Sequence, residues 1–161
     1  MHKTRIYLDT SVINFLYADD APEKKAITEE FFEKYVRLGV YDVFVSVVVV
    51  DEINLTNDDE HRRRLLNVVD EYRIPVIELS PVTAEVVPLA TRYILEGVVP
   101  AKNRNDALHV ALTTIMDYNV LLSWNFRHLA NINREARFLA INMNLGYIKP
   151  FRITIPYEVC T

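Results

Sequence analysis

The chain has 161 residues, half of them hydrophobic and a quarter charged, which is the composition of a globular protein that buries a substantial core. Its single cysteine, Cys160, excludes an intramolecular disulfide and favours a reducing compartment. The net charge of −4 argues mildly against nucleic acid as a partner.

The amino-terminal segment predicts a buried strand rather than a targeting signal. Basic residues precede the apolar run RIYL, residues 5–8, but Asp9 interrupts this run and no small-residue cleavage site follows. The longest apolar run, VFVSVVVV, is far too short to span a bilayer. We therefore expect a cytoplasmic protein with no membrane segment.

Strands and helices alternate along the rest of the chain, without a linker or an internal repeat. Thr10 or Ser11 is the expected cap of the first helix, and Pro88 is expected at a kink or break. Gly39 and Gly146 are expected to end helices. This alternation predicts one α/β domain, residues 1–161, with a mostly parallel central sheet. The expected strands cover residues 5–8, 41–46, 75–79, 120–124 and 151–155, and the expected helices cover residues 11–19, 23–39, 57–73, 81–97, 105–119 and 132–146.

Residues 43–56, VFVSVVVVDEINLT, are consistent with two local structures. Their β-branched residues are typical of one long strand. Alternatively Ser46 caps a helix that begins at Val47 and carries Glu52 in its second turn. We favour the helix because a strand–helix–strand alternation needs a crossover at this point.

Four oxygen-bearing side chains lie where elements begin or end. Asp9 closes the first strand, and Glu52 follows the second strand by a few residues. Asn125 comes directly after the strand VLLSW, and Asp106 lies in the first turn of a helix, where backbone N–H groups favour negative charge. Ligands of open parallel sheets bind beyond the carboxyl ends of the strands, so we expect the four to converge there.

Such convergence is costly without a cation. Two carboxylates ~4 Å apart repel by roughly 4 kcal/mol at an effective dielectric near 20, and a folded domain is stable by only about 5–15 kcal/mol. Oxygen ligands, without Cys or His at metal-binding spacing, indicate Mg²⁺ or Mn²⁺ rather than zinc. Such an ion activates water and acts as a Lewis acid in phosphodiester hydrolysis.

Each of these four residues also has an ordinary structural explanation. Asp9 can cap the following helix, and Glu52 can be an exposed helix charge. Asp106 can complement the helix dipole, and Asn125 can make the turn after its strand. Only their shared position at the ends of elements favours a common site.

Other polar and aromatic residues receive ordinary interpretations. His109 lies one helical turn past Asp106 and can touch the site, but it is interpreted first as a partly buried helix residue. Trp124 can stack on a base, but it is interpreted first as a packing residue. The run Arg62 to Arg64 is flanked by acids, which predicts an exposed helix face with internal ion pairs, and a partner or RNA surface only second. Residues that can steer a phosphate backbone near the expected site are Lys102, Arg104, Arg127 and His128.

The order of four short motifs resembles that of the PIN domain family, and especially its compact VapC-type toxins. The motifs are IYLDTSVIN, SVVVVDEI, NDALHVA and LLSWNFRHL, and the closing segment FRITIPYEV resembles the last strand and tail of such proteins. The resemblance covers residues 5 to about 158. It implies an α/β/α sandwich whose acidic pocket holds Mg²⁺ or Mn²⁺.

The resemblance also implies roles for individual residues. Asp9, Glu52 and Asp106 match the first three acids of the family pattern, and they would bind the metal. Asn125 stands where many members carry a fourth acid, which puts the fourth ligand in doubt. The hydroxyl residues Thr10, Ser11 and Ser123 resemble those that support the acids.

The function implied is metal-dependent hydrolysis of RNA by a toxin that a cognate antitoxin holds silent. Related toxins form homodimers, so we expect one here. One alternative is a catalytically weakened PIN-fold protein that acts through dimerisation or partner binding, with Asn125 marking the decayed site. A second is a magnesium-dependent phosphatase with Asp9 as nucleophile, although such enzymes usually have an acid two residues on, where this chain has Ser11.

Overall fold

A computed structural model describes residues 2–161, which form a five-stranded parallel sheet in the order β3-β2-β1-β4-β5. The strands are β1 (Arg5–Leu8), β2 (Asp42–Ser46), β3 (Val76–Ile77), β4 (Val120–Leu122) and β5 (Arg152–Thr154). The helices are α1 (Thr10–Asn14), α2 (Pro22–Glu30), α3 (Val47–Asn54), α4 (Asp59–Glu71), α5 (Val86–Leu95), α6 (Arg104–Ile115), α7 (Ile132–Asn144) and α8 (Pro156–Val159). Shorter helical segments are η1 (Phe15–Tyr17), η2 (Phe31–Val36), η3 (Pro81–Thr83) and η4 (Ala101–Asn103).

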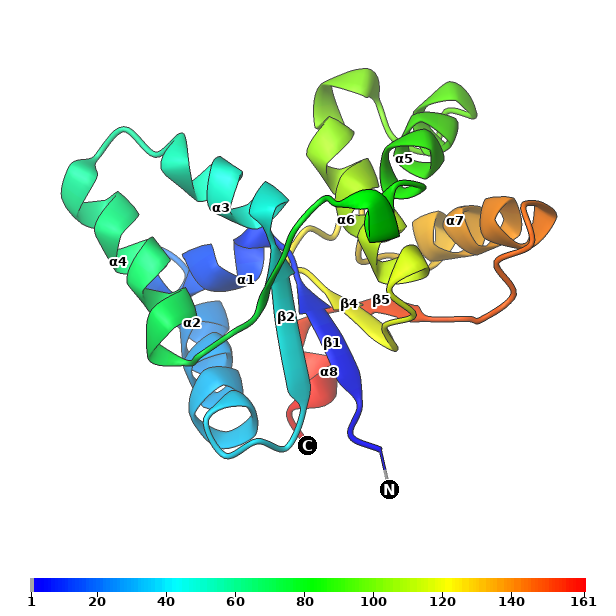
Figure 1. The fold of residues 1–161 in the computed structure, drawn as a ribbon. Coiled ribbons are helices and arrows are strands. Elements are labelled where there is room, and N and C mark those ends of the chain that lie inside the picture. The colour runs from blue at the N-terminus through cyan, green and yellow to red at the C-terminus, as the bar shows by residue number, and fades with distance from the viewer. Residues whose placement is uncertain (1) are drawn as a thin grey trace.

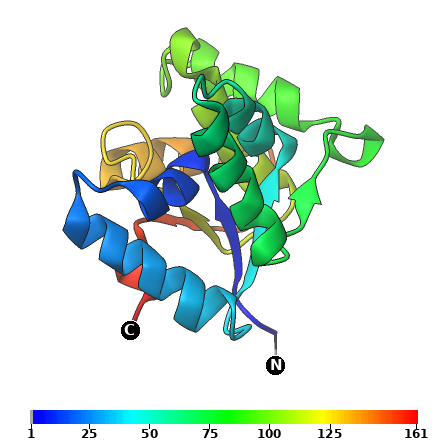
Figure 2. The same cartoon turned by 90° about the vertical axis from the view of Figure 1, so that its left-hand side faces the viewer.

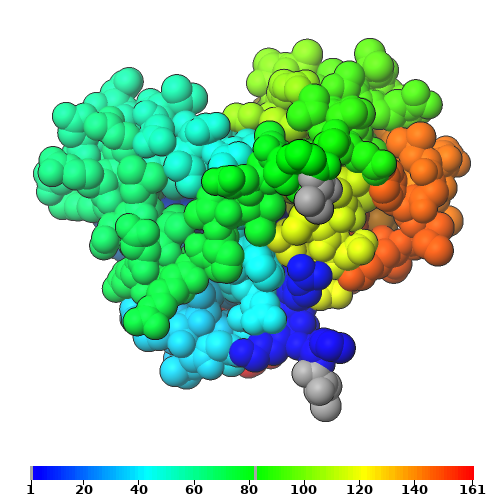
Figure 3. All heavy atoms as spheres, in the orientation of Figure 1, coloured from blue at the N-terminus to red at the C-terminus, as the bar shows by residue number. Residues whose placement is uncertain are grey.

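Helices cover both faces of this sheet. Figure 1 shows α1, α2 and α4 on one side and α5, α6 and α7 on the other, and Figure 2 shows the first group lying in front of β1. The chain between α4 and η3 crosses from one group to the other, and its atoms form a continuous band over the face seen in Figure 3. The predicted α/β/α sandwich is therefore confirmed, and every strand pairing is parallel.

The centre of the sheet is buried because β1 lies between β2 and β4. Ile6 is paired with Val43 on one side and with Val120 on the other. All residues of α6 from Ala107 to Thr114 are buried as well, so this helix is the core of its layer. None of the helices in residues 2–161 is both long and apolar enough to cross a bilayer.

The helix favoured for residues 47–55 is confirmed. The strand β2 ends at Ser46, whose Oγ accepts a hydrogen bond from the backbone N–H of Val48 and so caps α3. Gly39 and Gly146 adopt positive φ after the two helices they were expected to end.

One predicted helix cap is wrong, and one predicted break lies at a slightly different place. The residue before α1 is Asp9, not Thr10 or Ser11, and its side chain makes no capping hydrogen bond. The expected helix over 81–97 divides into η3 and α5, and α5 begins at Val86. Pro88 lies in the first turn of α5, where a missing N–H costs no helical hydrogen bond, so the expected break is present but lies just before Pro88, between η3 and α5.

Candidate active site

The order of the strands places a crevice at the carboxyl ends of β1 and β4. From β1 the chain moves to β2 and β3 on one side of the sheet, and it later returns to β4 on the opposite side. Such a reversal is where open parallel sheets bind ligands. Asp9 directly follows β1, and its backbone N–H donates to the carbonyl of Leu122 at the end of β4.

Asp9 lies at the bottom of this crevice, and its side chain is only 4% exposed. The hydroxyl of Ser11 donates a hydrogen bond to its Oδ1, and the hydroxyl of Ser123 donates one to its Oδ2; each donor–acceptor distance is 2.5 Å. Burial raises the pKa of Asp9 above its ordinary value, and the charge of Asp106 adds to this effect. A buried carboxylate held by two hydroxyls, with no capping role, needs an explanation other than the start of α1.

Glu52 reaches the crevice from the second turn of α3. Its Oε1 accepts hydrogen bonds from Thr10 Oγ1, at 2.7 Å, and from His109 Nε2, at 2.8 Å. Burial would raise the pKa of Glu52, but the hydrogen bond and the positive charge of His109 outweigh it, and the net pKa is lowered. Glu52 is therefore not the freely exposed helix charge of the ordinary explanation.

His109 connects Glu52 to the centre of the sheet. Its imidazole is 1% exposed, and its Nδ1 lies 2.7 Å from the hydroxyl of Tyr7, which in turn lies 2.7 Å from Ser46 Oγ. Because a carboxylate only accepts hydrogen bonds, Nε2 carries the proton that points at Glu52. These buried, hydrogen-bonded side chains hold the Glu52 carboxylate in place.

Asp106 and Asn125 face one another across the crevice. The Nδ2 of Asn125 and the Nδ2 of Asn103 each lie 3.4 Å from Asp106 Oδ2. The orientation of the Asn125 amide is determined by the backbone N–H of His128, which donates to its Oδ1 at 3.0 Å. Asn125 therefore turns a donor, not an oxygen, towards Asp106. Burial, together with the charge of Glu52, raises the pKa of Asp106.

One cavity of about 280 Å³ contains these groups, so the expected convergence is observed. Its lining residues are Asp9, Thr10, Ser11, Asn14, Glu52, Asp106, His109 and Asn125. Carboxylate, hydroxyl and amide groups make up this set, together with one imidazole already engaged by Glu52. Within residues 2–161, no group of three or more Asp, Glu, His or Cys side chains is arranged so that it could hold a metal ion by itself.

Tyr7 is a site residue that was not predicted, and His109 is a site residue for which contact with the site was only the second interpretation. His109 follows Asp106 by three residues on α6, the spacing that places two side chains on one helix face. That spacing was the available signal. Nothing local marks Tyr7, because its contacts with Ser46 and His109 join residues far apart in the sequence.

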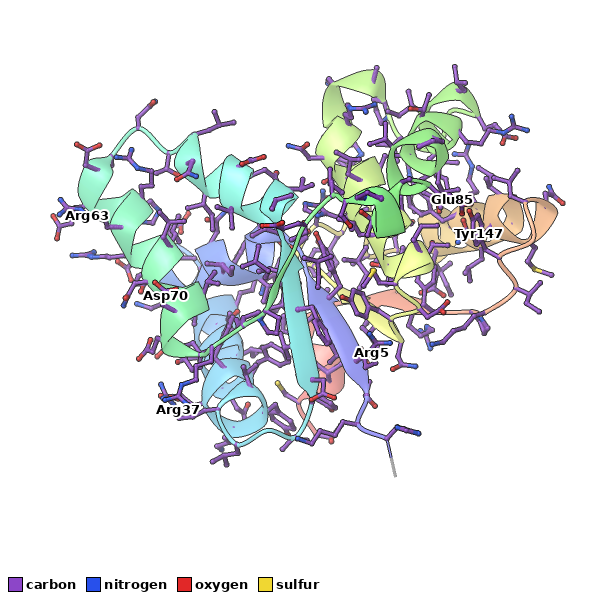
Figure 4. The ribbon with its side chains drawn as sticks, in the orientation of Figure 1. Arg5, Arg37, Arg63, Asp70, Glu85 and Tyr147 are labelled. Carbon is purple, nitrogen blue, oxygen red and sulfur yellow. The ribbon has the colours of Figure 1, made fainter. Side chains whose placement is uncertain are left out.

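The basic residues divide into two groups. In the run on α4, Arg62 pairs with Asp59 and Arg64 pairs with Glu60, which confirms the exposed, internally paired helix face. Figure 4 shows Arg63 pointing outward from α4. By contrast, the exposed Lys102, Arg104 and Arg127 have no carboxylate partner within the described part of the chain.

No family model and no curated protein matches this sequence, but solved structures have its fold. The crystal structure of FitAcB from Neisseria gonorrhoeae is similar over 95% of this chain and 99% of that chain, with a TM-score of 0.57 and 15% identity. VapBC2 from Rickettsia felis, bound to a DNA fragment from their promoter, is similar over 94% and 98%, with a TM-score of 0.57 and 13% identity. VapBC-5 from Mycobacterium tuberculosis, a member of the VapBC family of toxin–antitoxin systems, is similar over 92% and 98%, with a TM-score of 0.50 and 14% identity. The chain therefore has the fold of these three structures, as its resemblance to the PIN domain implies.

Proposed function

We propose that this PIN-fold chain is a metal-dependent endoribonuclease, and that it is the toxin of a toxin–antitoxin pair. One observation supports this proposal above all others. Asp9, Glu52 and Asp106 come from three different elements, yet they line one cavity at the switch point of the sheet. Burial and the charge of a neighbouring acid raise the pKa of Asp9 and of Asp106, as happens to acids at many functional sites.

The donor set of the cavity fits Mg²⁺ or Mn²⁺. Hard divalent cations prefer carboxylate oxygens, and magnesium is usually held by one or two carboxylates and several waters rather than by a complete protein cage. Asp9 and Asp106 would hold the ion, and Glu52 would bind it through water. When bound, such an ion supplies an activated water and neutralises charge on the phosphate.

The side chains around the acids have supporting roles in this proposal. Ser11 and Ser123 orient Asp9, while Thr10 and His109 orient Glu52, so the carboxylates are fixed before substrate arrives. Asn125 positions Asp106 through its amide N–H rather than offering an oxygen. The unpaired basic residues near the cavity, Lys102, Arg104 and Arg127, attract the phosphate backbone of RNA despite the net charge of −4.

An antitoxin is the proposed protein partner. VapBC-5 is named as a member of a family of toxin–antitoxin systems, VapBC2 is named as bound to a DNA fragment from their promoter, and the likeness of each covers nearly this whole chain. A homodimer and a cytoplasmic location belong to the same proposal, as does a single domain over residues 1–161.

A second candidate function is a catalytically weakened PIN-fold protein that acts by binding its partner. The orientation of Asn125 favours it, because the neutral amide offers its oxygen to His128 N and no fourth carboxylate faces the cavity. This candidate and the ribonuclease differ in a single measurable property, which is hydrolysis of RNA.

We expect the purified chain, freed from any partner, to cleave a single-stranded RNA oligonucleotide when Mn²⁺ or Mg²⁺ is present. EDTA should abolish cleavage, and excess Mn²⁺ should restore it. Products are resolved on a denaturing gel, with a phosphomonoester as the control substrate. Absence of RNA cleavage at any Mn²⁺ concentration would leave the weakened protein as the better account, and hydrolysis of the phosphomonoester alone would favour the phosphatase.

A further inference from the structure

Three aromatic rings and one lysine form a cluster beside the acidic cavity. The Lys24 ammonium lies 5.0 Å from the ring centroid of Phe126, 5.6 Å from that of Phe15 and 5.7 Å from that of Trp124. Phe15 packs on Trp124 with their centroids 5.5 Å apart, and Phe126 lies 6.3 Å from Trp124. We call these four residues the aromatic cluster.

The cluster adjoins the cavity along the chain at two points. Asn14 and Asn125 both line the cavity, and they directly precede Phe15 and Phe126. Consecutive Cα atoms are about 3.8 Å apart, so the cluster begins one residue away from the proposed reaction site on two separate segments.

The backbone around the cluster is held in place by the residues that hold Asp9. The Oγ of Ser11, which donates to Asp9, accepts a hydrogen bond from the backbone N–H of Trp124 at 2.9 Å. Trp124 Nε1 donates to Thr28 Oγ1 at 2.9 Å, and Trp124 is only 5% exposed, so it is a packing residue that supports its neighbours. The amide of Asn131 donates to the carbonyl of Phe126 at 2.8 Å and so pins the loop.

Phe126 and Lys24 are the members of the cluster that can meet a ligand. Phe126 is 46% exposed although it is a large apolar side chain on a pinned loop. Lys24 is half-buried and has no carboxylate partner within residues 2–161, so its charge is not neutralised locally. A fixed aromatic face beside an uncompensated cation is the combination that binds single-stranded nucleic acid, because every base has a π-face and every linkage a phosphate.

We infer that the aromatic cluster is a nucleotide-binding subsite, in which a base of single-stranded RNA next to the cleaved linkage stacks on Phe126 and a phosphate contacts Lys24. This inference rests on the proposed ribonuclease function and adds a substrate-binding element to it. It assigns RNA rather than a protein as the occupant, because the cluster directly continues the cavity that acts on the phosphodiester and carries an uncompensated positive charge. Stacking is tolerant of base identity, so the subsite favours single strands over particular sequences.

The test measures binding separately from cleavage. Fluorescence anisotropy of a fluorescein-labelled, single-stranded RNA oligonucleotide is followed with the full chain carrying Asp9→Asn and with Mg²⁺ present, so that the RNA stays intact. We expect Phe126→Ala to weaken binding by about 5- to 150-fold, the range for loss of one stacked base. Phe126→Leu should weaken RNA binding to a similar extent because leucine lacks a π-face. Phe126→Trp keeps a π-face and should bind RNA as tightly as the parent. Tyr157→Ala, which removes an exposed aromatic from α8, is the matched control and should bind normally.

The lysine is tested by the salt dependence of the same binding. Lys24→Gln should reduce the slope of log K against log salt concentration by about 0.7, the value for one phosphate contact on a single strand, and Lys24→Arg should preserve the slope. Thermal unfolding of each variant verifies that the substitution has left the fold intact.

Two results would overturn the inference. If Phe126→Ala or Phe126→Leu binds RNA as tightly as the parent while wild-type protein still cleaves RNA, the subsite is wrong and the ribonuclease stands; the cluster is then a surface for a protein. If the parent binds no RNA and the wild type cleaves none, the subsite and the proposed function fall together.

Discussion

Replacing Asp9 with asparagine is expected to reduce metal-dependent cleavage of RNA by more than about 100-fold, beyond the 10- to 100-fold that loss of an outer partner of a metal ligand typically costs. Asp9 is the most buried acid of the cavity, and both of its oxygens are oriented by hydroxyls. Asparagine keeps the shape but removes the charge that attracts the cation. Initial rates on an RNA oligonucleotide with saturating Mn²⁺ measure the effect, and cleavage at the wild-type rate would refute the role of Asp9.

The pH dependence of the stability of Asp9→Asn shows whether this variant is folded. Because burial raises the folded-state pKa of Asp9 above 3.8, its ordinary value, the metal-free native state holds this proton more tightly than the unfolded chain does. The contribution of Asp9 to stability is therefore fully present below about pH 3.8 and is lost as the pH rises through the raised pKa. Asp9→Asn cannot ionise and escapes this loss.

We accordingly expect the free energy of unfolding of Asp9→Asn, relative to that of the wild type in EDTA, to be larger at pH 7 than at pH 4. Urea denaturation at the two pH values measures the difference in the free energy of unfolding. A variant that is inactive but shows this gain is folded and has lost its chemistry, whereas a loss of stability at both pH values would mean that the inactivity reflects damage to the fold.

Replacing His109 with leucine is expected to reduce cleavage by about 10- to 100-fold, although His109 is not itself a metal ligand in this account. The imidazole Nε2–H holds Glu52 Oε1 at 2.8 Å, and without it the carboxylate is restrained by Thr10 alone. Loss of the buried partner should also lower the free energy of unfolding by about 1–3 kcal/mol. Rates and urea denaturation of the same preparation measure both effects.

Tyr7→Phe is the matched control for His109→Leu. It removes the Tyr7 hydroxyl, which contacts His109 and Ser46, and it leaves the hydrogen bond between His109 and Glu52. It should lower the free energy of unfolding by about 0.5–1.5 kcal/mol but reduce cleavage much less than His109→Leu. Equal losses of cleavage in the two variants would mean that His109 acts only by stabilising the core.

Local sequence signals were sufficient where one residue type determines the structure. Ser46 has a hydroxyl at the end of a strand, and its ability to cap α3 outweighed the β-branched composition of the four valines that follow. The alternation of buried strands with helices likewise gave a parallel sheet, because strands joined through crossovers of this length pair in parallel.

Local signals were insufficient where a distant partner decides. Asp9 precedes a helix in the manner of a cap, but Ser11 and Ser123 donate hydrogen bonds to its two oxygens, and Ser123, directly after β4, is far away in the sequence. Pro88 predicted a kink or break in its helix, and the break lies just before it, but the pattern alone could not locate the start of α5 at Val86. Tyr7 reads as one more apolar strand residue until its hydroxyl is seen between Ser46 and His109.

Asn125 shows the same limit within the site itself. The sequence placed it at the end of β4 among the acids, and the structure brings it to the same cavity. Which end of its amide faces the acids depends on the backbone N–H of His128, a contact that the turn alone creates. The positions of the four residues were thus accessible from the sequence, while their chemical roles remain predictions.

Location of the metal is the most direct test of the central claim, which is that Asp9, Glu52 and Asp106 together bind one hard cation. Crystals grown with Mn²⁺ and measured with X-rays that manganese scatters anomalously would reveal the ion. We expect a manganese peak in the cavity at ligand distance from the carboxylates of Asp9 and Asp106, with Glu52 within reach of a bound water. Manganese bound only elsewhere on a chain that cleaves RNA would contradict the account.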